Sequence, residues 1–271
     1  MKKNVCRISV ALLLIGVLFA FAACGGGSSN SGGGAEKLVC GVTEYEPMNF
    51  RVGGSWTGFD TEFAILVGEK LGMEVEFQLI DWLQKFAELD SGAIDAIWNG
   101  FTATADENGV PRINLCDMSY SYMLNTQCVI TRADKLAEFA SRNDAVGKSM
   151  AAEAGSAGEE EAIDLVGDES KVVGVPAQIN AFMEVKSGSV DGAVIDVILA
   201  QQLAGTGDYA DIVIAFELDP ELYAVGFKTG NALRDRVNQA MKELYDAGTL
   251  LELAKKYGLD DRLVLDTTFG Q

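Results

Sequence analysis

Hydrophobic and polar positions alternate along the chain in a way that predicts strands and helices in turn. Apolar runs at 37–42 and 93–99 are typical of buried strands, and 73–80 alternates between apolar and polar residues as a half-buried strand does. The segments 59–72 and 81–92 instead carry apolar residues at helical spacing and end in glycine. This order predicts an α/β protein.

A short pattern occurs twice. "LDSGAIDAIWNG" begins at Leu89 and "VKSGSVDGAVID" begins at Val185. Each predicts a helix end, a glycine turn and a short buried strand, so the chain is expected to hold two lobes of similar build. In open α/β sheets ligands bind at the carboxyl ends of strands. Gly100 and Asp196 each lie nine residues beyond the serine of their unit, so each lobe is expected to offer one of them to a ligand.

The N-terminus has the pattern of an export signal. Residues 1–23 combine a basic start with an apolar run too short for a comfortable membrane span, which predicts a signal peptide. "FAAC" resembles a bacterial lipobox, so Cys24 is the expected lipidation site and 24–36 a Gly/Ser-rich linker behind the anchor. The expected location is extracytoplasmic, on the cell membrane. An ordinary cleaved signal that releases a soluble protein is the alternative.

Composition excludes several classes of function. The chain has 21 basic and 40 acidic residues, a net charge of −19, which argues against nucleic acid as a partner. It has no histidine, and Cys40, Cys116 and Cys128 lack metal-ligand spacing, so we expect no metal and no cofactor. The three thiols are expected to be small buried hydrophobes, although a bridge between Cys116 and Cys128 stays open.

The order and spacing of seven segments resemble the family 3 solute-binding proteins, the polar amino-acid receptors of ABC importers. The resemblance extends over about 37–258 and rests on "EYEPMNF", "GFDTEFAILVGEKLG", "DWLQKFAELDSGAIDAIWNGFTAT", "RINLCDMSYSY", "AAEAGSAGE", "GSVDGAVID" and "ELYAVGFKTGNALRDRVNQAMKEL". It implies an α/β, two-lobed periplasmic-binding-protein-like (type II) fold with two hinge strands, near Leu124–Gln127 and Tyr223–Phe227. The implied division is lobe 1 at 37–125, lobe 2 at 126–223, and a C-terminal return to lobe 1 at 224–271.

The resemblance also implies a ligand-binding set. Arg112 would hold the α-carboxylate of the ligand, although "ADENGVP" inserts about five extra residues between Thr104 and this arginine. Asp196 would hold the α-ammonium, which agrees with the cost of burying an unpaired carboxylate in the apolar string "AVIDVIL". The other implied contacts are an aromatic pair, three residues of lobe 1 and a helix N-terminus in lobe 2, namely Tyr45 and Trp82; Asn99, Gly100 and Thr102; Ser156 and Ala157.

The implied function is capture of a free polar L-amino acid between two closing lobes and its delivery to the permease subunits of an ABC transporter. Glu44 and Glu46 would favour a basic side chain, Asn99 beside Trp82 would suit glutamine, and cystine stays open; we favour a neutral side chain slightly over a basic one. Two alternatives remain. One is a ligand-sensing module for a signalling partner. The other is a cyclohexadienyl or prephenate-type dehydratase on the same fold, for which Glu44, Glu46 or Asp106 could supply acid–base chemistry.

Overall fold

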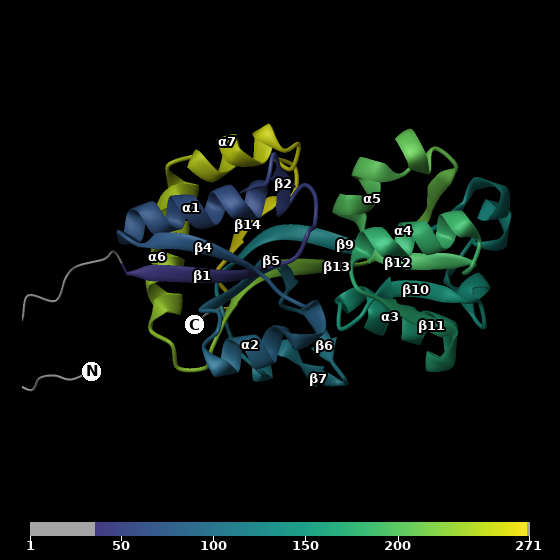
Figure 1. Ribbon diagram of the computed structural model, residues 1–271, viewed down its shortest axis with the longest axis horizontal. Helices are drawn as coiled ribbons and strands as arrows, with labels where there is room; N and C mark the ends of the chain where they lie inside the picture. The colour runs from purple at the N-terminus through teal and green to yellow at the C-terminus, as the bar shows by residue number, and fades with distance from the viewer. Residues whose placement is uncertain (1–35, 270–271) are drawn as a thin grey trace, which may run out of the picture. The chain divides into compact units, whose positions relative to one another are not determined.

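The computed structural model of this chain describes residues 36–269 (Figure 1). The predicted signal peptide, the predicted lipidation site Cys24 and nearly all of the predicted linker lie outside the described residues. Within 36–269, no helix combines the length and the apolar character needed to cross a bilayer.

One ten-stranded mixed sheet forms the frame of the described part (Figure 1). Its main path runs β11-β10-β12-β9-β13-β5-β1-β4, with β14 pairing β9 and β8 pairing β13. The strands of this sheet are β1 (Lys37–Val42), β4 (Glu74–Leu79), β5 (Ala96–Thr102), β8 (Asp117–Met118), β9 (Ser121–Arg132), β10 (Met150–Glu153), β11 (Val172–Val175), β12 (Gly192–Asp196), β13 (Ile212–Phe227) and β14 (Leu263–Asp266). Two separate hairpins are β2 (Phe50–Val52) with β3 (Ser55–Thr57) and β6 (Asp106–Glu107) with β7 (Val110–Pro111).

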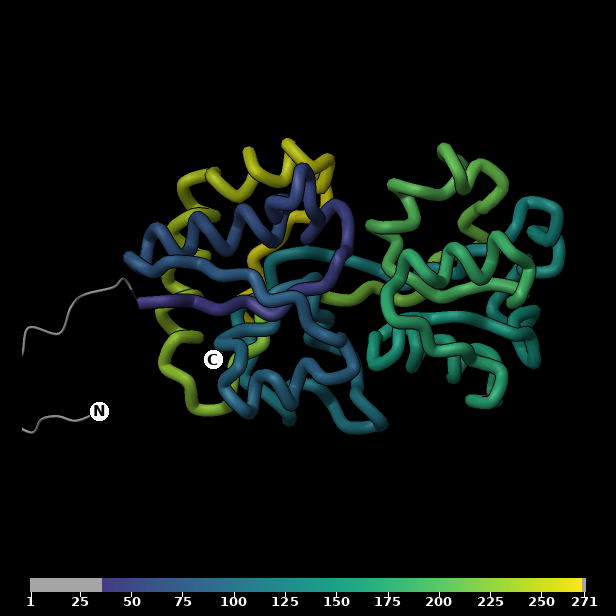
Figure 2. Tube along the Cα trace, viewed as in Figure 1, coloured from purple at the N-terminus to yellow at the C-terminus, as the bar shows by residue number. Residues whose placement is uncertain are grey.

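Helices cover this sheet in both lobes. The α-helices are α1 (Phe59–Leu71), α2 (Lys85–Ser91), α3 (Ala157–Val166), α4 (Gln178–Ser187), α5 (Val197–Leu203), α6 (Leu233–Asp246) and α7 (Thr249–Lys256). The 3-10 turns are η1 (Trp82–Gln84), η2 (Arg112–Asn114), η3 (Ala133–Glu138), η4 (Arg142–Ala145), η5 (Glu169–Lys171) and η6 (Gly207–Tyr209). The two C-terminal helices α6 and α7 pack against α1, so the yellow-green to yellow helices of the Cα trace lie beside the blue helix (Figure 2).

The two halves of the sheet are built alike, which gives the two-lobed fold. In one lobe β1 pairs in parallel with β4 and β5; in the other β10 pairs in parallel with β11 and β12. An antiparallel strand closes each set, β13 beside β5 and β9 beside β12. These two long strands also pair with each other and carry the chain between the lobes. The predicted boundaries at 125/126 and 223/224 fall inside them and stay a prediction.

The repeat found in the sequence is confirmed as a structural repeat. Gly92 ends α2 with φ 76° and Gly188 ends α4 with φ 77°, both in the left-handed region that glycine adopts without strain. The strands β5 and β12 follow these two turns. The strand expected at 93–99 begins later, at Ala96, because Ala93 still donates its N–H back to the Glu88 carbonyl at the end of α2.

All three cysteines of the described part are buried free thiols, so the bridge between Cys116 and Cys128 does not form. Cys40 lies in β1 and Cys128 in β9, whereas Cys116 follows η2. Burial raises the pKa of Cys116 to about 12, which keeps this thiol protonated and unreactive at neutral pH.

Candidate functional site

A small cavity lies between the lobes, where the carboxyl ends of β5, β10 and β12 approach one another. Its volume is about 20 Å³, room for about one or two water molecules. Eight of the nine residues expected to bind ligand line it; Tyr45 does not. The lining comprises Trp82, Asn99, Gly100, Thr102, Arg112, Gln127, Glu153, Ser156, Ala157, Gln178 and Asp196.

Gly100 sits in β5 at a position that only glycine fits. Its φ is +55°, and a Cβ atom there would lie 2.7 Å from Cε1 of Tyr45 and 3.0 Å from Cε2 of Tyr223. Its N–H donates to Oδ2 of Asp60 at 2.6 Å, and burial raises the pKa of that carboxyl to about 7. The strand therefore brings its backbone, without a side chain, to the cavity wall.

Asn99 and Thr102 line the cavity, but their side chains form hydrogen bonds with other residues of the protein. The Asn99 amide donates to Oγ1 of Thr43 at 2.7 Å and accepts from the Thr43 N–H at 2.9 Å, which fixes the loop after β1. The Thr102 hydroxyl donates to Oε1 of Glu221 at 3.1 Å. These two side chains hold the first lobe in shape, and any ligand contact from them needs a change of partner.

Arg112 reaches the cavity despite the insertion before it. The inserted residues fold into the β6–β7 hairpin, and this hairpin returns Glu107 to the guanidinium, with Nε 3.2 Å and Nη2 3.1 Å from Oε2. Nη1 donates to the Thr102 carbonyl at 3.3 Å, and Nη2 donates across the lobes to the Gly155 carbonyl at 3.1 Å. The side chain is buried and spans both lobes.

Lys85 is a second buried cation, which the sequence analysis did not select. Its Nζ lies 2.7 Å from Oε1 of Glu107 and donates to the Gly155 carbonyl at 2.8 Å. Burial, with the nearby charge of Arg112, lowers its pKa to about 8, and Glu107 opposes that shift. Lys85 follows Trp82 by one helical turn, and this spacing beside an expected binding residue was the available signal.

Asp196 ends β12 and is held entirely by neutral donors. Its Oδ1 accepts from Gln127 at 2.8 Å and from the Tyr223 hydroxyl at 2.6 Å; Asn125 and Gln178 also donate to the carboxylate. Among the described residues no lysine or arginine forms an ion pair with it, so the internal salt bridge that could explain a buried aspartate is missing there. Burial raises its pKa, and these hydrogen bonds oppose the rise.

Glu153 ends β10, the parallel neighbour of β12, and is also new to the site. The residue is 4% exposed, and its Oε1 has no hydrogen-bond partner in the described part of the chain. Burial, with a contribution from Asp196, raises its pKa to about 8, while Lys85 opposes the rise. The argument that singled out Asp196, an acid at the end of an apolar strand, applies equally to "MAAEAG" and would have found Glu153.

The two expected aromatic residues differ in position. Trp82 lines the cavity, packs edge-on against Phe101 at 6.0 Å, and has Nζ of Lys85 at 5.4 Å from its ring centroid. Tyr45 stands behind Gly100, where its hydroxyl bonds that of Tyr223 at 2.8 Å. In this conformation Trp82 alone of the expected pair forms part of the wall.

The N-terminus of α3 faces the cavity with a capped first turn. Ser156 is the N-cap, and its Oγ accepts from the Glu159 N–H at 3.1 Å. The Glu159 carboxylate in turn accepts from the Gly155 N–H at 2.7 Å. The N–H groups of Ala157 and Gly158 have no partner within the helix, because the first turn lacks preceding carbonyls.

The three acids that the sequence suggested for side-chain specificity or acid–base chemistry lie outside the cavity. Glu44, Glu46 and Asp106 are exposed and do not line the cavity. Glu44 lies 3.5 Å from Nε of Arg51, a surface pair. The described residues also contain no cluster of three or more side chains suited to hold a metal ion.

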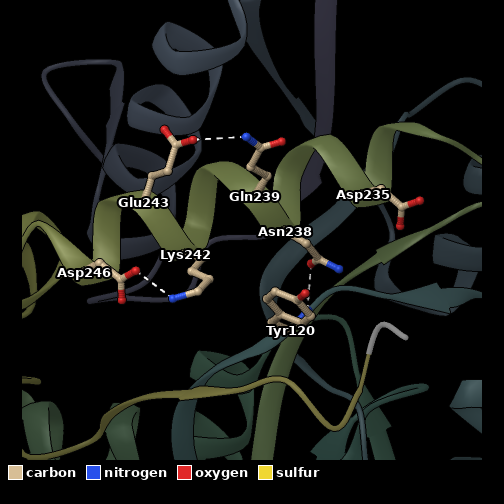
Figure 3. Close-up of a pocket in the computed structure, with 7 residues that line it drawn as sticks. All are labelled: Tyr120, Asp235, Asn238, Gln239, Lys242, Glu243 and Asp246. Carbon is tan, nitrogen blue, oxygen red and sulfur yellow. Dashed lines mark hydrogen bonds and ion pairs between the residues drawn. The ribbon is translucent and has the colours of Figure 1, made fainter.

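A larger hollow of about 430 Å³ runs beside α6, on the surface (Figure 3). Its ionisable side chains have polar partners: Lys242 pairs with Asp246, Glu243 accepts from Gln239 at 3.2 Å, and Asp235 pairs with Arg234 beside the hollow. Asn238 accepts from the Tyr120 N–H at 2.8 Å. This hollow is an open groove with satisfied polar groups, and it contains none of the expected binding residues.

Comparison with known proteins gives the family. A model of the bacterial extracellular solute-binding proteins, family 3, matches residues 38–260. The arginine-binding extracellular protein ArtP of Bacillus subtilis is 30% identical over 252 residues, 91% of this chain and 96% of that protein. The L-cystine-binding protein TcyA of the same organism is 28% identical over 270 residues, 93% and 97% of the two chains. A solved ancestral arginine-binding protein bound to arginine matches with a TM-score of 0.75 at 28% identity, covering 82% of this chain and 97% of that one. The chain is therefore a member of family 3 of the bacterial extracellular solute-binding proteins, a binding protein and not an enzyme.

Proposed function

We propose that this protein captures a free polar amino acid between its two lobes and delivers it to the permease of an ABC transporter. The observation that carries the proposal is the placement of Arg112 and Asp196, one from each lobe, on the wall of a single cavity. A guanidinium and a carboxylate that face the same space suit the two ends of a zwitterion. The arginine- and cystine-binding relatives support an amino acid as the ligand.

Binding needs the lobes to part, because the present cavity is far smaller than the roughly 300–1,000 Å³ of a typical small-molecule site. Parting the lobes breaks the bond between Arg112 and the Gly155 carbonyl, which frees a donor for the α-carboxylate of the ligand. The second lobe then brings Asp196 to the α-ammonium and the first turn of α3 to the carboxylate. Closure removes water, and the charged contacts strengthen in the lower dielectric.

We further propose that Cys24 is lipidated and anchors the protein on the outer side of the cell membrane through the linker at 24–36. The support is the signal pattern of residues 1–23 together with the family, whose members are extracellular. Labelling cells with a radioactive or clickable fatty acid tests this. Label on the wild-type chain and none on Cys24→Ser is the expected result, and a wild-type chain without label contradicts the anchor.

Thermal unfolding against a panel of amino acids tests the binding function. The purified protein is unfolded and refolded to strip carried-over ligand, then mixed with each amino acid, cystine and ornithine. A ligand at about a thousand times its Kd stabilises the folded state by roughly 4 kcal/mol, a shift in Tm that is readily measured.

Arg112→Ala and Asp196→Asn are each expected to abolish that shift while the proteins stay folded by circular dichroism. Asp106→Asn, an exposed acid of the β6–β7 hairpin, is the matched control and should respond as the wild type does. A panel in which no amino acid shifts the Tm of the wild type overturns the proposed function.

A further inference from the structure

Glu153 is a buried acid of the cavity wall that the zwitterion contacts do not use. Asp196 has four neutral donors around it and a ligand ammonium assigned to it, whereas Oε1 of Glu153 has no partner in the region the structure describes. Burying an unpaired carboxylate is costly, and neutral or charged donors normally surround one. The free oxygen therefore indicates a group that arrives with the ligand.

The nearby cations are already committed to another acid. Lys85 and Arg112 both bind Glu107, at 2.7 Å and 3.1 Å, and both donate to the Gly155 carbonyl. In the closed arrangement neither forms an ion pair with Glu153 among the described contacts. The second lobe thus presents a buried acid that no cation of the described residues contacts directly, and a ligand cation that reaches Glu153 favours release of its proton.

The charge of the cavity wall leads to the same conclusion. Its charged lining residues are Arg112, Glu153 and Asp196, one cation and two acids. A neutral zwitterion pairs with Arg112 and Asp196 and leaves Glu153 without a charged partner. An amino acid with a cationic side chain supplies that partner and stabilises the ionised form of Glu153.

The wall also offers a surface that accepts a cation. Trp82 lines the cavity, and the ammonium of Lys85 already lies 5.4 Å from the centroid of its ring. Indole faces attract ammonium and guanidinium groups and pack against their alkyl stems. A basic side chain can therefore pass along Trp82 on its way to Glu153.

We propose that Glu153 is the specificity-determining residue of this site and selects an amino acid with a cationic side chain, of the arginine, lysine or ornithine class. The inference rests on the proposed function and names the ligand class of the same site. It reverses the slight preference for a neutral side chain in the sequence analysis.

Isothermal titration of the wild type and of Glu153→Gln with arginine, lysine, ornithine, glutamine and cystine tests the assignment. The glutamine variant keeps the shape of the side chain and removes its charge. We expect the wild type to prefer basic ligands and the variant to bind its best basic ligand roughly 10- to 100-fold more weakly, with binding of neutral ligands unchanged. Glu169→Gln, which removes an acid from an exposed turn of the same lobe, is expected to bind as the wild type.

Each other outcome has a definite meaning. A wild type that binds glutamine or cystine but no basic amino acid overturns this inference and leaves the proposed function standing. Equal loss of basic and neutral ligands in Glu153→Gln also overturns it, because Glu153 would then hold the α-ammonium. A wild type that binds no amino acid removes the proposed function itself. The wild-type preference is decisive even where the variant fails to fold.

Discussion

Glu107 is the shared acceptor of two buried cations, so its replacement by glutamine tests how far the inserted hairpin stabilises the site. The side chains of Lys85 and Arg112 are 0% and 1% exposed, and that of Glu107 is 12% exposed. Removing one partner of a buried ion pair costs roughly 3–5 kcal/mol, because the remaining charge is left uncompensated. The two cations do not share this cost equally.

Lys85 can avoid an uncompensated buried charge by losing its proton. Its pKa is already lowered to about 8, so deprotonation at pH 7 limits its part of the cost to roughly 1–2 kcal/mol. Arg112 cannot deprotonate and carries the rest. For a domain of this size 1 kcal/mol corresponds to about 2–4 °C, so Glu107→Gln is expected to lower the Tm by roughly 6–20 °C.

Thermal unfolding at pH 7 without ligand measures this loss, with Asp106→Asn as the matched control in the same hairpin. Lys85→Met combined with Glu107→Gln should lose less than the sum of the two single variants, because the double variant leaves one buried cation instead of two. A Glu107→Gln protein that melts within about 2 °C of the Asp106→Asn control refutes the reasoning, since that shift corresponds to far less than the free energy expected for removing the carboxylate from two buried cations.

Two further predictions concern the cavity wall and pH. Gly100→Ala places a methyl group 2.7 Å from Tyr45 at φ +55°, so we expect a loss of roughly 1–3 kcal/mol in the free energy of unfolding, measured by urea titration; an unchanged midpoint contradicts it. Burial raises the pKa of Glu153 and Glu221 to about 8 and of Asp60 to about 7, so the folded state holds protons that the unfolded state has released. The contribution of these groups to the stability of the ligand-free protein should therefore be highest below about pH 4 and fall as pH rises toward 8. Glu153→Gln should make the fall less steep by about 1.4 kcal/mol per pH unit, the effect of one proton. An unchanged slope in this variant contradicts the raised pKa of Glu153.

Local patterns gave the frame of the fold because each depends on neighbours in sequence. The strand at 37–42 and the helix that ends at Gly72 have the predicted bounds within a residue or two, since periodicity and a glycine stop decide them. The late start of β5 was missed because a tight turn after Gly92 consumes residues whose apolar character is that of a strand. The division into two lobes followed from the repeat, not from any single segment.

The residues of the candidate site differ in how far the sequence could predict them. Arg112 was selected by resemblance and Asp196 by its spacing in the repeat as well, and the structure brings both to one cavity. Gln127 and Gln178 carried no comparable signal, because a polar residue on a helix or strand acquires its role only from the residues that face it in the folded protein.

Glu107 could not be foreseen as a partner of Arg112, although the insertion that carries it was visible. The conformation of a short hairpin decides which way its side chains point, and here Asn108 at φ 50° and Gly109 at φ 74° turn the chain back toward the arginine. Tyr45 illustrates the opposite case. Tyr45 was expected to line the cavity, but the backbone of Gly100 lies there instead and the tyrosine ring packs against the other side of that glycine.

The size of the cavity has a kinetic consequence for the proposed carrier role. A cavity of about 20 Å³ has no room for an amino acid, so we expect the lobes to part before a ligand can enter. If β9 and β13 are the hinge, as predicted, the rates of ligand entry and release depend on how often these paired strands bend and let the lobes part, and not only on the strength of the ligand's contacts. Unloading on a useful timescale thus becomes the task of whatever partner forces those two strands to bend, and a tight-binding carrier can still release its cargo quickly when such a partner is engaged.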